Sequence, residues 1–198
     1  LDARDVIGWA GDFAFVTAPA SFRPLRFAVL CDSRGTIGGS EYNLEGLNAR
    51  TLQSLLAASL AQNAEFVLIP GDLVSGYSTE VRDLELQLES FKRATGPVHR
   101  YLPFFLTPGN HDITFDLTSS DLRRSKPSPN RSEEVWARAF VQPTNGPPPE
   151  RDGAPPYDET AYSFDYAGVH IAVVNTVYWL ESRPSAERGN RMGFVMDE

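Results

Sequence analysis

Three short apolar runs in this sequence are each followed by a polar turn, and a helix-like segment joins one turn to the next run. The runs occupy residues 26–31, 66–69 and 104–106. Apolar runs of this kind between turn signals are typical of buried strands. Strands that alternate with helices predict a parallel sheet with right-handed crossovers, in which all carboxyl ends meet at one edge. The chain is therefore expected to be an α/β protein with three polar turns at one edge of its sheet.

The two segments between these strands have the apolar spacing of amphipathic helices. The first is expected to begin after an N-cap at Asn43 and to run to about Gln62, with its leucines on one side. The second is expected to begin after Ser78 or Thr79. It should end at Gly96-Pro97, since proline does not fit a helix interior.

After residue 115 the pattern loosens, and the sequence predicts a loop insertion over residues 115–160. A capping box at residues 130–133 predicts a short helix within the insertion, and clusters of proline predict an extended loop after that helix. Two strand-like runs then flank Ala167-Gly168. This arrangement predicts an antiparallel hairpin over residues 161–175.

The three polar turns carry side chains that can bind a metal ion. Asp32 follows the first strand, Asp72 the second and Asn110 the third, and His111 stands beside Asn110. Carboxylate and amide oxygens bind hard divalent cations, and an imidazole can donate a proton to a leaving oxygen. Any one of these residues could be a simple turn or helix-cap residue. Three of them at one edge of a sheet favour a divalent-metal site.

Composition narrows the class of protein. The 198 residues are enough for one domain, and 41% hydrophobic with 22% charged residues is ordinary for a folded soluble protein. A net charge of −8 argues against a general nucleic-acid binder. No apolar run approaches the roughly 18 residues that a membrane span needs. The single cysteine, Cys31, excludes an intrachain disulfide framework and is expected to be a small core residue.

The same turns resemble the first three motifs of the calcineurin-like metallophosphoesterases. The motifs are Asp32 within Val29–Gly35, then Pro70-Gly71-Asp72-Leu73-Val74, then Pro108-Gly109-Asn110-His111-Asp112. Residues 162–171 are similar to the hairpin that follows in that family. The resemblance covers residues 25–112 and 160–178. It implies a four-layer α/β/β/α sandwich with mixed sheets, and metal-dependent hydrolysis of a phosphate monoester or diester.

The resemblance also implies a role for each site residue. Asp32 would bind one metal ion, Asp72 would bridge two, and Asn110 would bind the second. His111 would hydrogen-bond the phosphate and assist the leaving group. Two divalent or trivalent ions of the manganese, iron or zinc class would clamp the phosphoryl oxygens and supply hydroxide at neutral pH.

Three departures from the family pattern bear on function. Arg34 stands where the family usually has a histidine, and Ser75 where many relatives have a second aspartate. Arginine stays protonated and cannot be a ligand, but it can hold a phosphate bidentately or form an ordinary surface ion pair. The family's later histidine ligands have no counterpart, since the remaining histidines are His99, expected to be solvated, and His170, expected to be structural.

These departures lead to expectations for domains and function. Residues 1–24 are expected to form an arm or strand, and residues 25–198 the N-terminal part of a metallophosphoesterase-like domain from a longer chain. A phosphoesterase acting on a phosphorylated substrate is the leading hypothesis. Arg34 favours the alternative, a non-catalytic relative that binds a phosphate or a protein in the crevice. The charge disfavours a nucleic-acid phosphodiesterase without excluding it, because metal sites can offset an acidic surface. The sequence leaves the compartment open between cytoplasm and export.

Overall fold

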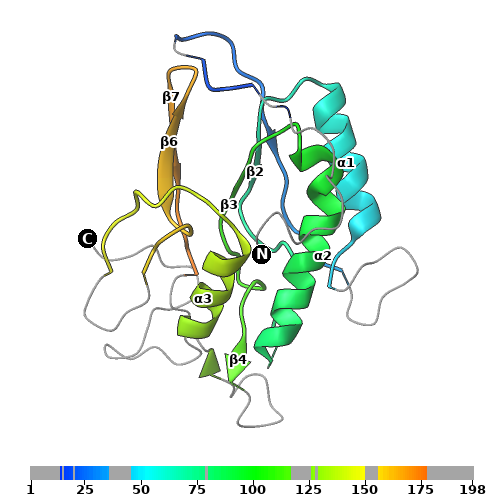
Figure 1. Ribbon diagram of the computed structural model, residues 1–198, viewed down its shortest axis with the longest axis vertical. Helices are drawn as coiled ribbons and strands as arrows, with labels where there is room; N and C mark the ends of the chain where they lie inside the picture. Colours follow the sequence, from blue (N-terminus) through cyan, green and yellow to red (C-terminus); the bar gives the residue numbers. More distant parts are fainter. Residues whose placement is uncertain are drawn as a thin grey trace.

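The computed structural model describes residues 14, 16–19, 21–35, 46–78, 80–116, 126–127, 129–149 and 156–177. In chain order the elements are β1 (Ala28–Val29), α1 (Ala49–Ala61), β2 (Val67–Ile69), α2 (Val81–His99), β3 (Phe104–Leu106), β4 (Phe115–Asp116), β5 (Lys126–Pro127), α3 (Pro129–Ala139), β6 (Tyr162–Tyr166) and β7 (Val169–Val173) (Figure 1). No helix within the described ranges combines the length and apolarity needed to cross a membrane.

The central sheet has the strand order β1-β2-β3, and both pairs of neighbours are parallel. Helices α1 and α2 lie on one side of this sheet, and the antiparallel hairpin of β6 and β7 lies on the other (Figure 1). The described residues thus form three layers: helices, parallel sheet and hairpin. This mixed α/β architecture, with parallel and antiparallel sheets, confirms the predicted α/β class, while the four-layer sandwich stays a prediction.

Two apolar clusters hold the three layers together. The larger one fills the space between the sheet and the helices and includes Leu56, Leu88 and Phe91, all of them buried. The smaller one is aromatic and lies between the sheet and the hairpin. There the buried Phe66 ring lies 5.7 Å from Phe164, centroid to centroid. These clusters fix the strand ends and hence the turns that follow them.

Both long helices were predicted, but their ends differ from the prediction. Helix α1 starts at Ala49 after an Asn48 cap, whose side chain accepts from the Thr51 N–H, and the expected end near Gln62 is confirmed. The predicted cap Asn43 lies outside the described residues. Helix α2 has Glu80 at its N-cap and runs through Pro97 to His99.

The physical reasons for these differences in α2 are local. Ser78 lies two residues before the N-cap and does not cap the helix. Its hydroxyl instead donates to the Glu80 carbonyl and accepts from the Glu80 N–H. Thr79 lies outside the described residues. Pro97 removes only one N–H from the last turn, and Val98 in the same turn packs against the core. Packing of the last turn therefore outweighs the tendency of Pro97 to end the helix.

Strand β1 is shorter and more exposed than the sequence suggested. Val29 is 57% exposed, and Cys31, predicted as a core residue, is exposed as well. The reason is the position of β1 at the edge of the sheet, where its described partner is β2 on one side. The apolar run of residues 26–31 correctly indicated a strand, but burial on both faces depends on strand order.

The later part of the chain follows the prediction in outline. Helix α3 forms where the capping box indicated, and residues 140–149 form no helix or strand. The hairpin forms around Ala167-Gly168. His170 on β7 faces Asp165 on β6, with Nδ1 and Oδ1 2.8 Å apart, which suits the structural role expected of it. Most of the predicted arm over residues 1–24 lies outside the described residues.

Candidate metal and phosphate site

The polar turns that follow β1, β2 and β3 are called the strand exits from here on. All three meet at one edge of the sheet, as their order in the sequence predicted. The Arg34 Nε atom lies 3.6 Å from Asp32 Oδ1 and 3.4 Å from Asp72 Oδ2. The other oxygen of Asp72, Oδ1, accepts a hydrogen bond of 3.1 Å from the backbone N–H of His111. The exits of β1, β2 and β3 are therefore linked through one arginine and one aspartate.

The exits of β2 and β3 are in direct backbone contact. Gly71 has a φ of +103°, and a Cβ atom built on it would lie 2.5 Å from the Gly109 Cα. Any side chain at Gly71 would thus be strained in conformation and would also collide with the neighbouring turn. The glycines of the two motifs are needed for this approach, which brings Asp72 beside the Asn110-His111 turn.

Asp112 also connects the exits of β2 and β3 through hydrogen bonds. Its carboxylate is fully buried and accepts backbone N–H bonds from Gly109 at 2.9 Å, Leu73 at 3.2 Å and Val74 at 3.1 Å. Burial raises the pKa of Asp112 to about 7, although the three N–H donors act in the opposite direction. Asp112 belongs to the third motif, but nothing in the sequence indicated this role for it.

His111 is oriented by the backbone of Ser75. Its Nδ1 atom lies 2.8 Å from the backbone carbonyl oxygen of Ser75. Because a carbonyl oxygen can only accept, Nδ1 carries the proton, and Nε2 is the ring nitrogen that remains for chemistry. The backbone of Ser75, which follows the second motif, thus orients the imidazole.

Tyr77 is a site residue that sequence reasoning missed. Its hydroxyl accepts a hydrogen bond from Asn110 Nδ2, and its ring lies 4.1 Å from the His111 ring, centroid to centroid. With Nδ2 engaged, Asn110 Oδ1 is the atom that can bind a cation. Tyr77 also has a φ of +49°, an uncommon value for a bulky residue. The preceding Gly76 was the only hint in the sequence of an unusual turn here.

The two aspartates share a backbone conformation but differ in their surroundings. Asp32 and Asp72 both have a φ of +54°, which aspartate tolerates better than most residues and which recurs at functional sites. The Asp32 side chain is 58% exposed and that of Asp72 only 14%. Asp72 is therefore the more firmly held of the two.

The oxygen donors at this edge fit one hard cation better than two. Within the described ranges no three His, Cys, Asp or Glu residues group closely enough to hold a metal ion. Asp72 and Asn110 offer a carboxylate and an amide oxygen from adjoining turns, a pair suited to a divalent cation. A further cation between Asp32 and Asp72 would have to share that space with the Arg34 guanidinium.

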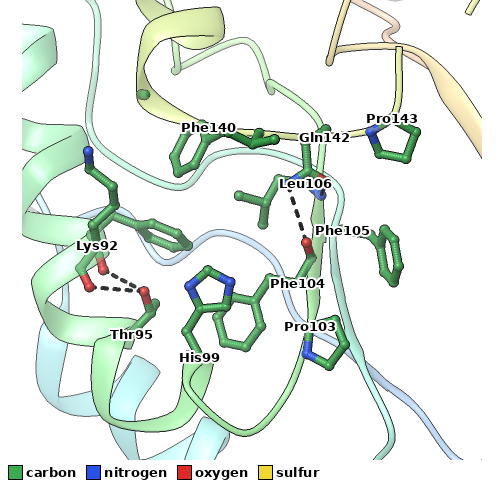
Figure 2. Close-up of a pocket in the computed structure, with 13 residues that line it drawn as sticks. Lys92, Thr95, His99, Pro103, Phe104, Phe105, Leu106, Phe140, Gln142 and Pro143 are labelled. Carbon is green, nitrogen blue, oxygen red and sulfur yellow. Dashed lines mark hydrogen bonds between the residues drawn. The ribbon is translucent and has the colours of Figure 1, made fainter. Parts of the chain in front are cut away.

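A cavity of about 550 Å³ lies elsewhere, between α2, β3 and the segment after α3 (Figure 2). Two of its polar groups already have partners: Lys92 pairs with Glu89, and Gln142 binds the backbone of Leu106 and Phe104 along the outer edge of β3. The apolar surroundings lower the pKa of His99, which remains exposed as predicted. The cavity contains no cluster of reactive groups, so the strand exits are the better candidate site.

Comparison with known proteins identifies the family of this chain. The chain matches the family model of the calcineurin-like phosphoesterases over residues 37–185, and it belongs to that family. Asp72, Asn110 and His111 lie inside the matched range, whereas Asp32 and Arg34 precede it. A comparison with curated proteins gave no match. Membership of this family indicates metal-dependent hydrolysis of a phosphoester.

Proposed function

We propose that this chain hydrolyses a phosphate monoester or diester at the edge formed by the exits of β2 and β3. The observation that carries the proposal is the hydrogen bond of 3.1 Å between the His111 N–H and Asp72 Oδ1. It joins the two motifs of the family at the atoms where a cation and a phosphate would meet. This geometry does not require a bound ligand. It is held by the close approach of Gly71 to Gly109 and by the buried Asp112 carboxylate.

Asp72 and Asn110 would hold a divalent cation of the manganese, iron or zinc class. When bound, such a cation would neutralise charge on the phosphoryl oxygens and make a water more acidic. Arg34 is 44% exposed with its Nε toward the aspartates, so its two Nη atoms can donate to a phosphate oxygen. His111 in its protonated form would give the Nε2 proton to the leaving oxygen.

In the two-ion form that the family resemblance implies, Asp32 would bind one ion, Asp72 both, and Asn110 the second. That form requires Asp32 and Asp72 to share a cation beside Arg34. The proposed hydrolysis needs the ion at Asp72 and Asn110 and does not depend on the other one.

The second candidate function is binding of a phosphate without hydrolysis. It is favoured by Arg34, because the guanidinium of an arginine can hold a phosphate bidentately without any metal ion. The two functions differ in one respect that can be measured: hydrolysis requires Asp72 and a metal ion, and simple binding to Arg34 does not.

The test uses the full-length protein, freed of metal with a chelator and supplied with Mn²⁺, acting on p-nitrophenyl phosphate and its diester. We expect hydrolysis that disappears in Asp72→Ala and falls by roughly 10²–10⁴-fold in His111→Ala. Asp165→Ala, an exposed aspartate on the hairpin, serves as the matched control and should be fully active. Unchanged hydrolysis in Asp72→Ala would refute the site. Binding of phosphate by a protein that hydrolyses neither ester would favour the second candidate.

A further inference from the structure

Arg34 occupies a position that a metal ion would otherwise need. Its Nε atom lies within 3.6 Å of an oxygen of Asp32 and within 3.4 Å of an oxygen of Asp72. These two carboxylates are the pair that would share a cation in a two-ion site. An arginine keeps its positive charge at any pH at which proteins are folded, so it repels a second cation at this position permanently.

The backbone around Arg34 is fixed from both sides. The preceding Ser33 is buried and donates its hydroxyl to the Leu73 carbonyl at 2.7 Å. The following Gly35 donates its N–H to the Gly46 carbonyl at 3.0 Å, and a Cβ atom on Gly35 would lie only 2.8 Å from the Leu47 carbonyl carbon. Arg34 itself forms a backbone bridge with Leu47. The side chain of Arg34 therefore extends from a well-anchored backbone, and both aspartates lie near its Nε atom.

We infer that Arg34 is a built-in cation that replaces one of the two metal ions, so that the site binds a single ion at Asp72 and Asn110. This inference rests on the proposed function, since it specifies the metal content of that same site. The Arg34 guanidinium supplies one positive charge between the aspartates. Its Nη donors remain for a phosphate oxygen, which the missing ion would otherwise contact.

The test counts metal ions directly and does not use activity. The full-length protein is freed of metal, dialysed against excess Mn²⁺ and analysed for manganese per chain by mass spectrometry. Electron paramagnetic resonance of the same sample separates an isolated Mn²⁺ ion from an exchange-coupled pair. We expect one Mn²⁺ per chain and the spectrum of an isolated ion.

A substitution sharpens the result. Arg34→His removes the fixed charge and adds an imidazole, and we expect two Mn²⁺ per chain with a coupled spectrum. Arg82→His, which adds an imidazole on an exposed part of α2, is the matched control and should stay at one. Two Mn²⁺ per chain in the wild-type protein would overturn the inference, whether or not the variants fold. One Mn²⁺ per chain in a folded Arg34→His variant would also overturn it.

These outcomes separate the inference from the proposed function. One Mn²⁺ per chain without hydrolysis of any phosphate ester leaves the inference standing and refutes the function. Two Mn²⁺ per chain, together with hydrolysis that is lost in Asp72→Ala, refutes the inference and supports the proposed function. A protein that binds no Mn²⁺ refutes both.

Discussion

The exit of β1 and the joined exits of β2 and β3 carry the same type of residue in very different settings. Asp32 and Asp72 have the same φ of +54°, yet the first is mostly exposed and the second is mostly covered. Strand β1 pairs with β2 over two residues at the sheet edge, whereas β2 pairs with β3 over three. Asp112 also joins the exits of β2 and β3, which are called the inner exits. The exit of β1, called the outer exit, is joined to them through Arg34 and Ser33.

This difference shows which half of the site is preorganised. At the inner exits, buried and partly buried hydrogen bonds position the side chains of the site before any ligand arrives, and such positioning lowers the cost of binding. At the outer exit Asp32 forms an ion pair with the partly exposed Arg34, and ion pairs of this kind contribute little to stability. Chemistry that depends on fixed geometry is therefore expected at Asp72, Asn110 and His111, while Asp32 has a supporting role.

The largest effect is expected where the inner exits are joined. Asp112→Ala leaves the buried N–H groups of Gly109, Leu73 and Val74 without an acceptor, and each lost acceptor is costly. We expect the free energy of unfolding to fall by about 3 kcal/mol or more, as measured by urea denaturation. Ser163→Ala, a change on the hairpin, is the control. A loss below about 1 kcal/mol would show that Asp112 does not join the exits.

Titration of the same carboxyl gives a second effect on stability. Burial raises the pKa of Asp112 from 3.8 to about 7, so between these values the folded chain keeps a proton that the unfolded chain has lost. The stability of the metal-free protein should then fall as the pH rises through this window, by at most about 1.4 kcal/mol per pH unit. Asp112→Asn should lack this slope. Parallel pH profiles for the two proteins would contradict the assignment.

A smaller effect is expected from Tyr77→Phe. This change keeps the ring beside His111 and removes the hydroxyl that accepts from Asn110 Nδ2. Groups that orient a metal ligand typically contribute 10–100-fold to affinity, and we expect roughly tenfold weaker Mn²⁺ binding by calorimetry. Tyr101→Phe, an exposed tyrosine at the end of α2, should bind normally. Equal affinity in the two variants would remove Tyr77 from the site.

The smallest effect is expected at the cavity beside β3. His99→Ala removes a ring that packs against Phe104 with a centroid distance of 4.7 Å, in a cavity whose lining contains none of the proposed site residues. We expect kcat/KM for the aryl phosphate to change less than about twofold and stability to fall by about 1 kcal/mol. A tenfold loss of activity would show that the cavity takes part in the reaction.

The sequence was informative where a feature depends on local pattern and strand order. Residues 66–69 and 104–106 indicated β2 and β3, and the alternation of strands and helices correctly placed Asp72 beside the turn of Asn110. The roles of Asp112 and Tyr77 could not be seen, because each depends on an approach of chain segments more than 30 residues apart. The exposure of Cys31 was missed for the same reason, since burial of a strand depends on its neighbours in the sheet.

The central claim is that the inner exits bind the metal ion and the outer exit supports them. It is tested most directly by measuring Mn²⁺ affinity of the full-length protein by calorimetry in two variants, Asp72→Ala and Asp32→Ala. The account predicts that Asp72→Ala loses more than about 100-fold in affinity, beyond the range of residues that only orient ligands, while Asp32→Ala loses less than about tenfold. Equal losses in both variants, or a larger loss in Asp32→Ala, would contradict it.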